Sequence, residues 1–169
     1  MIIHSKEELE QIMKVVESAQ YYVDDIKKGE RTKKAPLPFT TSTLQQEASK
    51  VLNFATQKTM RIAQQLYEGI DIKGSGTVGV ITYLRTDSTR ISAEADANAR
   101  EYIAQNYGEN YVSAVAKKAD DGKKIQDAHE AIRPTDITRT PATLKRLPYK
   151  GSVSIVSVIW KRFAASRMN

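Results

Sequence analysis

The sequence predicts a mainly α-helical fold with minor β structure, in the α+β class. Several stretches repeat apolar residues every three or four positions, which gives a helix one apolar side. Only the run 78–84 combines β-branched and aromatic residues over the length of a strand. The chain has 169 residues, 40% of them apolar, so it can bury the core of one domain or slightly more. It contains no internal repeat and no low-complexity tract.

The N-terminal part predicts a helix over residues 6–19. Ser5-Lys-Glu-Glu8 has the form of a capping box, and apolar residues follow at helical spacing: Leu9, Ile12, Met13 and Val16. Residues 21–26 are a strand candidate. A basic connection over 27–34 leads into two prolines within 35–38, which favour extended backbone and mark a boundary.

The middle of the chain predicts two helices and a strand. Thr40–Thr43 offers several N-caps for a helix with a clear apolar stripe: Leu44, Ala48, Val51 and Leu52. A second helix covers roughly 57–68 and ends at Gly69. The loop 73–77 then enters the strand 78–84. This loop lacks the GxxxxGK[ST] form of a phosphate-binding loop, so it is predicted to be a turn.

The C-terminal half predicts further helices. Ser92 caps an alanine-rich helix that continues to about residue 106. Residues 117–127 form a charged loop, and 128–133 form a helical turn that the next proline ends. Residues 140–145 have a proline in the first turn, as a short helix would. The segment 153–165 fits either a helix or a β-branched strand, and a helix is favoured.

Composition limits the function classes. The net charge of +6 and a pI near 9.4 weakly favour a polyanionic partner. The absence of cysteine excludes disulfides, thiolate zinc sites and a cysteine nucleophile. No apolar run approaches the ~20 residues that span a bilayer, and acids occupy the place of a signal peptide's apolar region. We therefore expect a soluble cytoplasmic protein.

The run Gly79–Ser88 is a candidate site for chemistry. In an extended segment residues two apart share a face, so Tyr83, Arg85 and Asp87 would project the same way. A phenol beside a guanidinium can attack a phosphodiester, because the cation screens both the phenolate and the phosphate charge. Spacing alone favours the simpler alternative of a packed tyrosine followed by a polar turn.

The run Gln126–Pro134 is a second candidate. In a helical turn, His129 and Arg133 are four residues apart and share a face, where they could bind a phosphate or assist proton transfer. Taken alone, a surface turn with a Glu130–Arg133 ion pair is the favoured alternative. Two histidines without cysteine form no evident transition-metal site, and no Asp-x-Asp pair is present to hold magnesium.

Three segments, in this order along the chain, together resemble the bacterial type IA DNA topoisomerases. They are Pro38-Phe-Thr-Thr-Ser-Thr-Leu-Gln-Gln-Glu-Ala48, Gly79-Val-Ile-Thr-Tyr-Leu-Arg-Thr-Asp-Ser88 and Ala128-His-Glu-Ala-Ile-Arg-Pro134. Each segment is long, and chance does not explain the three together. The resemblance runs from about residue 5 to about 140, and resumes over 159–168.

The resemblance implies a role for each candidate residue. Tyr83 would attack a phosphodiester of single-stranded DNA, form a 5′-phosphotyrosyl link and free a 3′-hydroxyl. Arg85 would stabilise the phosphate charge and position the phenol, and Asp87 would orient groups at the same DNA-binding site. His129 would support the DNA backbone near the cleavage site. Arg133 would be a further phosphate contact.

The resemblance also implies an organisation. Residues 38–137 would form a winged-helix-like tyrosine domain, and 1–37 with 138–169 the remnant, packed together, of the adjoining hinge or arch domain. The magnesium ion (Mg2+) of the whole enzyme would be bound by a domain outside this chain, and none is expected within it. The expected partners are single-stranded DNA and the remaining domains of the parent enzyme, at the nucleoid, and no membrane.

The expected activity is relaxation of negative supercoils by the complete enzyme, with the fragment inactive by itself. One alternative is a non-catalytic module that binds single-stranded DNA, in which Tyr83 only stacks on a base. Another is a partner-binding or structural domain whose basic charge is incidental. The sequence does not decide between a relaxing and a decatenating subtype.

Overall fold

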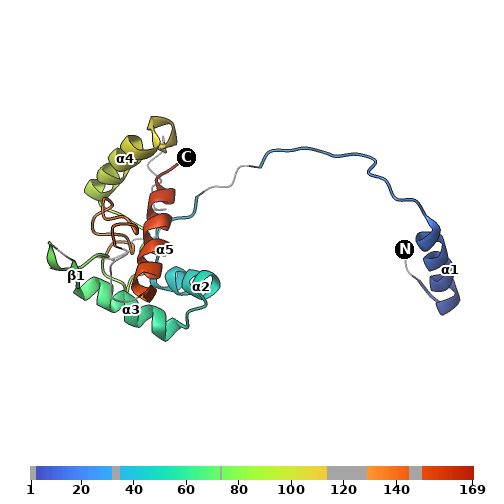
Figure 1. Ribbon diagram of the computed structural model, residues 1–169, viewed down its shortest axis with the longest axis horizontal. Coiled ribbons are helices and arrows are strands. Elements are labelled where there is room, and N and C mark those ends of the chain that lie inside the picture. The colour runs from blue at the N-terminus through green and yellow to red at the C-terminus, as the bar shows by residue number, and fades with distance from the viewer. Residues whose placement is uncertain (1–2, 32–34, 73, 114–128, 145–149) are drawn as a thin grey trace. The chain divides into compact units, whose positions relative to one another are not determined.

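The computed structural model divides the chain into two compact units, residues 1–33 and 34–169 (Figure 1). The residues that the structure describes are 3–31, 35–72, 74–113, 129–144 and 150–169. Their regular structure consists of five α-helices, a short 3-10 helix and a two-stranded sheet. The predicted mainly α fold with minor β structure is confirmed. The predicted loop over 117–127 lies outside the described residues.

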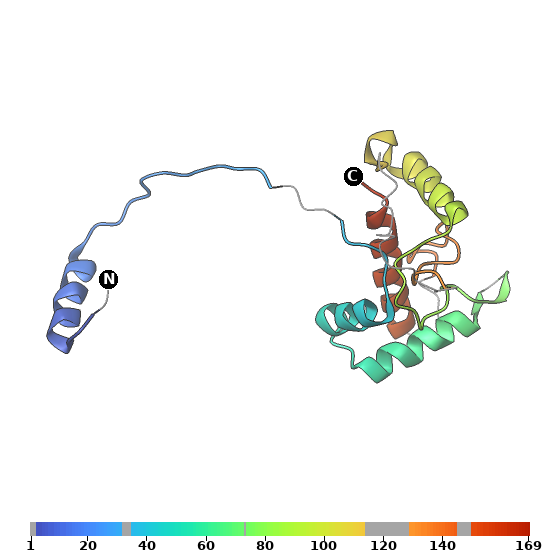
Figure 2. The same ribbon diagram turned by 180° about the vertical axis from the view of Figure 1, so that it is seen from behind.

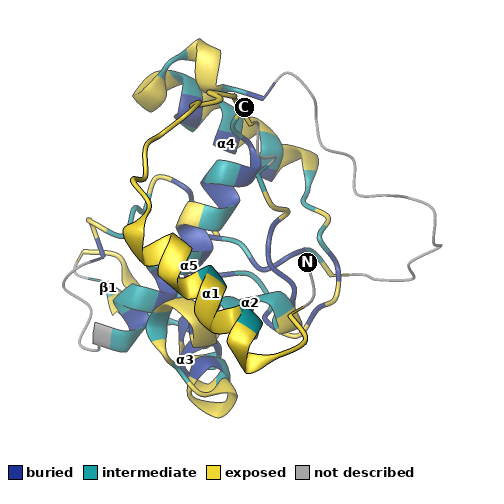
Figure 3. Ribbon diagram, turned by 90° about the vertical axis from the view of Figure 1, so that its right-hand side faces the viewer, coloured by how far each residue is buried: buried dark blue, intermediate teal, exposed yellow. Residues whose placement is uncertain are grey.

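The first unit contains helix α1 (Lys6–Ser18), close to its predicted range. Ser5 caps it by accepting a hydrogen bond from the main-chain N–H of Glu8 at 3.1 Å. None of its residues is buried, and Figure 3 shows it exposed along most of its length. The predicted strand at 21–26 is wrong, since residues 19–31 form neither helix nor strand. A strand needs a neighbour for its main-chain groups.

The second unit contains four helices, each close to a predicted range: α2 (Thr41–Leu52), α3 (Thr56–Glu68), α4 (Ala93–Tyr107) and α5 (Lys150–Ser166). Thr40 and Ser92 cap α2 and α4, each accepting from the N–H three residues on. Gly69 and Gly108 follow α3 and α4 with φ values of 125° and 104°, which strain any residue that has a Cβ. The 3-10 helix η1 (Glu109–Tyr111) follows α4.

Helices α2, α3 and α5 lie side by side and enclose the main core, as Figures 1 and 2 show. Leu44, Ile62 and Ile159, one from each helix, are at most 3% exposed. A smaller core joins α4 to the other end of α5 through Trp160 and Phe163. The buried residues of α5 recur at helical spacing, so the helix prediction for this segment is confirmed over the strand alternative.

The C-terminal segment belongs to the compact unit that carries Tyr83. Helix α5 fills the main core, and the indole N–H of Trp160 donates to the carbonyl of Ile137 at 2.8 Å. The structure therefore does not divide the chain near residue 138, where the sequence placed a boundary. The assignment of 1–37 and 138–169 to an adjoining domain of a parent enzyme stays a prediction, as does the winged-helix likeness.

An ion-pair cluster ties the end of α5 to α4. Arg167 is 4% exposed, and its Nη1 lies 2.9 Å from Asp96 Oδ1. Arg100 Nε lies 2.6 Å from the other carboxylate oxygen, and its Nη1 donates to Ser113 O. Burial by itself raises the pKa of Asp96, but the hydrogen bonds and charges of the two arginines outweigh it. The pKa of this carboxyl therefore lies below its ordinary value.

The sheet lies earlier than the sequence predicted. Strands β1 (Ile70–Ile72) and β2 (Gly76–Val78) form an antiparallel hairpin. Residues 74–75 of the predicted turn 73–77 form a turn between them, whereas 76–77 belong to β2. The predicted strand over 78–84 is wrong as a continuous strand: from residue 79 on, its only described ladder contact is the bridge between Ile81 and Pro134. These residues are held instead by hydrogen bonds to several separate segments.

Residues 129–134 form no helix, so the predicted helical turn over 128–133 is wrong where the structure describes it. Antiparallel bridges join Ile132 to Phe39 and Pro134 to Ile81. Pro134 disfavours helical backbone at the residue before it, and the bridges supply hydrogen bonds that a helical turn would forfeit. The predicted short helix at 140–145 is also wrong in its described part, where residues 141–144 form turns.

Candidate active site around Tyr83

Main-chain hydrogen bonds join the three segments that resemble the topoisomerase motifs. The N–H of Ile132 donates to Phe39 O at 2.8 Å, which links the first segment to the third. The N–H of Thr82 donates to Arg133 O at 2.9 Å, which links the second to the third. The N–H of Thr41 donates to Thr86 O at 2.8 Å and completes the set. Residues distant in sequence therefore meet around Tyr83.

Two threonine side chains hold the backbone on either side of Tyr83 and Arg85. The hydroxyl of Thr82 donates to Ala131 O at 2.7 Å and accepts from the N–H of Arg133 at 3.0 Å. The hydroxyl of Thr41 donates to Leu84 O at 2.8 Å and accepts from the N–H of Thr86 at 2.9 Å. From the sequence Thr41 is only one of several N-cap candidates and Thr82 has no predicted role, because a hydroxyl's long-range partners leave no local pattern.

The ring of Tyr83 is half-buried between two other rings. The His129 ring centroid lies 4.7 Å away with its plane tilted by 40°. The Tyr67 ring centroid lies 5.5 Å away with an interplanar angle of 69°, an edge-on contact. The structure therefore brings the predicted residue His129 to Tyr83. It also adds Tyr67 of α3, a residue for which the sequence predicts no role at the site.

The predicted common side of Tyr83, Arg85 and Asp87 is supported by alternating burial. Leu84, Thr86 and Ser88 are buried, whereas Arg85 and Asp87 are exposed and Tyr83 is half-buried. The alternation persists although the chain bends at residues 84–85. The guanidinium and the carboxylate therefore reach solvent, where a polyanionic ligand could meet the cation.

Arg133 is engaged with its own neighbours. Its Nε and Nη2 each lie 2.7 Å from Glu130 Oε2, and its Nη1 donates to Pro134 O at 2.9 Å. This is the ion pair that the simpler alternative predicted. A phosphate would have to compete with Glu130 for the guanidinium. The site role of Arg133 stays a prediction, and its geometry favours it less than that of Arg85.

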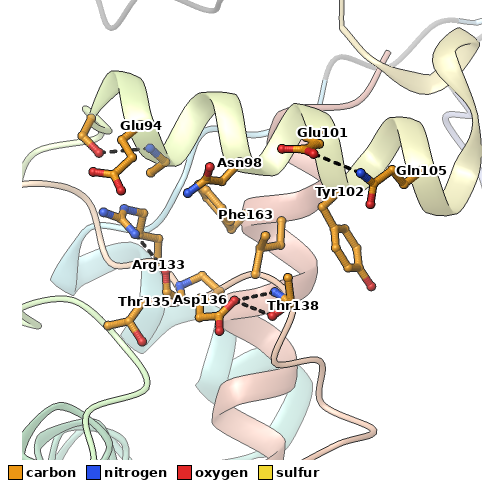
Figure 4. Close-up of a pocket in the computed structure, with 14 residues that line it drawn as sticks. Glu94, Asn98, Glu101, Tyr102, Gln105, Arg133, Thr135, Asp136, Thr138 and Phe163 are labelled. Carbon is orange, nitrogen blue, oxygen red and sulfur yellow. Dashed lines mark hydrogen bonds between the residues drawn. The ribbon is translucent and has the colours of Figure 1, made fainter.

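The side chain of Arg133 also lines a polar pocket of about 450 Å³ between α4 and residues 133–138 (Figure 4). Glu94, Glu101 and Asp136 contribute acids to it, and Tyr83 is not among the lining residues. Burial opposes ionisation of Asp136, but hydrogen bonds from Thr138 and the charge of Arg139 keep its pKa below the ordinary value. These acids make the pocket a poor place for a phosphate.

Clusters of side chains that ligate metal ions were sought among the described residues. Among them no three histidine, aspartate or glutamate side chains group closely enough to hold a metal ion. No step of the chemistry below is therefore derived through a metal bound by this chain. In the same described residues, no helix is both long and apolar enough to cross a membrane.

The site is thus a half-buried phenol beside an imidazole, with a cation two residues on, at the junction of three hydrogen-bonded segments. Such a site suits a protein that handles phosphodiesters.

A family model for DNA topoisomerase matches residues 2–169. The structure of full-length topoisomerase I from Thermotoga maritima is similar, with a TM-score of 0.69 and 45% sequence identity. The match covers 80% of this chain and 21% of that chain.

This chain belongs to the bacterial type IA DNA topoisomerase family. It spans about a fifth of the Thermotoga protein, since the match covers 21% of that chain.

Proposed function

We propose that this chain supplies the nucleophile of a type IA topoisomerase. The phenolic oxygen of Tyr83 attacks a phosphorus atom of single-stranded DNA and forms a 5′-phosphotyrosyl bond. The bond from that phosphorus to the 3′ oxygen breaks, the phenol's proton is released, and the departing 3′ oxygen takes up a proton. The observation that carries the proposal is the position of Tyr83, accessible and flanked by His129, where the three family segments meet.

The neighbouring side chains suit this chemistry. A free phenol titrates near ~10, so attack at neutral pH needs a nearby cation. Arg85 is exposed two residues from Tyr83 and can hold a phosphate through paired N–H donors. His129 contacts the Tyr83 ring and is exposed, so it can bind the DNA backbone beside the attacked phosphate. Asp87 is exposed on the same side and is proposed to orient these groups.

Reversal of the attack reseals the strand. The freed 3′-hydroxyl attacks the phosphotyrosine, so the bond energy is conserved and no ATP is required. In the complete enzyme, passage of a strand between the two steps would relax negative supercoils. Magnesium is proposed to be bound by another part of that enzyme. The enzyme is proposed to be cytoplasmic and associated with the nucleoid.

The decisive experiment replaces Tyr83 by Phe in the complete enzyme. A single-stranded oligonucleotide labelled at its 3′ end should yield labelled protein with the native enzyme, because the protein joins the 5′ phosphate. A 5′ label should instead appear on a shortened free strand. Tyr83→Phe should abolish both products while DNA binding is retained. Tyr107→Phe, at the end of α4, is the matched control and should cleave normally.

The exposed rings also favour a second candidate, a non-catalytic module that binds single-stranded DNA by stacking. That function would survive Tyr83→Phe, and the native enzyme would give no labelled protein. Persistence of the covalent product in Tyr83→Phe would refute Tyr83 as the nucleophile.

We also propose that the 169-residue chain alone does not cleave DNA efficiently, because its described residues contain no cluster of three histidine, aspartate or glutamate side chains that could hold a metal ion. Incubation with magnesium and the 3′-labelled oligonucleotide tests this. Efficient formation of labelled protein would refute it.

A further inference from the structure

Tyr67 is an exposed aromatic residue whose neighbour is the proposed nucleophile. It lies in the last turn of α3 and is 40% exposed. Its ring centroid is 5.5 Å from that of Tyr83 in an edge-on contact, which places a solvent-accessible ring beside the attacking phenol. Packing alone does not require such a large exposed ring here, because Ile62, Ala63 and Leu66 already form the buried side of α3.

The position of Tyr67 is fixed by the backbone of the motif that carries Tyr83. The N–H of Val80 donates to Leu66 O at 2.8 Å. Gly79 then runs so close to the helix end that a Cβ on it would lie 2.6 Å from Tyr67 O. Tyr67 is therefore held against the start of the Tyr83 segment and not merely near it.

An exposed ring beside a phosphodiester site suits the face of a nucleobase. Single-stranded DNA binds by stacking bases on aromatic side chains while cations contact its phosphates. Successive nucleotides of a strand rise by about 3.4 Å, so a ring 5.5 Å from the phenol lies within two nucleotide steps of the attacked phosphate.

We propose that Tyr67 stacks on the base of a nucleotide flanking the phosphodiester that Tyr83 attacks. Tyr67 is thus a substrate-binding residue that selects which phosphodiester reaches Tyr83. This inference rests on the proposed function, because it places the attacked phosphate at Tyr83. It adds a residue from outside the three family segments.

The test measures binding of single-stranded DNA to the complete enzyme that carries Tyr83→Phe, so that no cleavage intervenes. The cleavage site is first mapped on one oligonucleotide with the native enzyme. A series of oligonucleotides then has one abasic nucleotide at each position within two steps of that site. Removal of the stacked base should weaken binding roughly tenfold at one position. Adding Tyr67→Leu should weaken binding of the intact strand by a similar factor and abolish the abasic effect.

Two further variants separate stacking from a structural role. Tyr67→Phe keeps the ring and should bind like the native residue. Tyr107→Leu, which changes an exposed tyrosine in the last turn of α4, is the matched control and should keep the abasic effect.

Fluorescence gives an independent readout of stacking. The Tyr67→Trp variant should lose fluorescence on binding the intact strand, and lose less with the abasic strand. The complete enzyme without the Tyr67→Trp change, titrated with the same strands, provides the background; within this chain the single native tryptophan, Trp160, is buried. This measurement decides the question if the Tyr67→Leu variant fails to fold.

The outcomes distinguish failure of the inference from failure of the proposed function. The stacking role would be overturned if an abasic nucleotide weakened binding equally with and without the Tyr67 ring. It would also be overturned if no abasic position weakened binding. A native enzyme that makes no covalent product would refute the proposed function instead. In that case an abasic scan of the whole oligonucleotide would still show whether Tyr67 stacks on a base.

Discussion

Replacing Thr41 by Val should loosen the segment that carries Arg85. The hydroxyl of Thr41 is the described hydrogen-bond partner of both Leu84 O and the N–H of Thr86, at 2.8 and 2.9 Å. Leu84 and Thr86 are 1% and 8% exposed, so water replaces the lost partner poorly. Valine has nearly the shape of threonine and removes only the hydroxyl.

The magnitude follows from the two main-chain groups that lose this partner. A buried donor or acceptor left unsatisfied costs about 1–3 kcal/mol. Thr86 O keeps its bond from the N–H of Thr41 at 2.8 Å, so it adds little. Thr41→Val should therefore lower the free energy of unfolding by roughly 2–6 kcal/mol. Thr41→Ser retains the hydroxyl and should recover most of that loss.

Urea unfolding of the 169-residue chain measures this change. Thr59→Val is the matched control, because Thr59 is fully buried and its hydroxyl donates within α3 to Ala55 O. That carbonyl also accepts the N–H of Thr59 at 3.0 Å, so it keeps a partner. A difference between Thr41→Val and Thr59→Val of only a few tenths of a kcal/mol would refute the reasoning. In the complete enzyme, Thr41→Val should slow cleavage more than it weakens DNA binding.

Three more predictions follow. Gly79→Ala should destabilise the chain by about 1–3 kcal/mol in urea unfolding, because its new Cβ would meet Tyr67 O at 2.6 Å; unchanged stability would contradict this. Asp96 has a lowered pKa in the fold, so the stability it provides is present above the unfolded pKa near ~3.9 and lost as pH falls through the folded pKa. Native chain and Asp96→Asn should therefore converge in urea unfolding between neutral and acidic pH, and a constant difference would refute the linkage. Arg85→Gln should slow cleavage about 10²–10³-fold without shifting the melting temperature, since Arg85 is exposed, and a large shift would show a structural role instead.

The helices were predictable because their signals are local. Thr40 and Ser92 stand where caps were predicted, and Gly69 ends α3 as expected. The ambiguous segment 153–165 became a helix because its buried residues face both cores from one side. Periodicity carries this information within a few turns of chain, and no distant partner is needed to read it.

The extended segments were harder to predict than the helices, for two different reasons. Residues 129–134 match a helical turn locally, but Phe39 and Ile81 draw them into isolated bridges. The short hairpin at 70–78 has too few alternating residues to stand out from a loop. At residues 129–134 long-range hydrogen bonds outweigh the local preference.

The same difference between local and long-range signals applies to the residues of the candidate site. Tyr83, Arg85 and His129 were identified by their motifs, and the structure brings Tyr83 and His129 into ring contact. Tyr67 was missed because it lies within a predicted helix and outside the three motifs, although it is 40% exposed. A cap, a stripe or a motif can be read from the sequence, whereas an edge-on contact between two rings cannot.

The architecture separates the groups that hold the site from the groups proposed to react. The hydroxyls of Thr41 and Thr82 bond main-chain groups of neighbouring segments, whereas Arg85 and His129 are exposed and Tyr83 is half-buried. Changes to the exposed groups should therefore alter chemistry at constant stability, and changes to the threonines should alter both. This separation suits the proposed nucleophile. The fold of this chain fixes the position of Tyr83 by itself, so Tyr83 is in place before the proposed magnesium-binding part of the enzyme acts. It also makes stability and cleavage independent readouts, so a failed reaction can be traced either to a displaced backbone or to a missing reactive group.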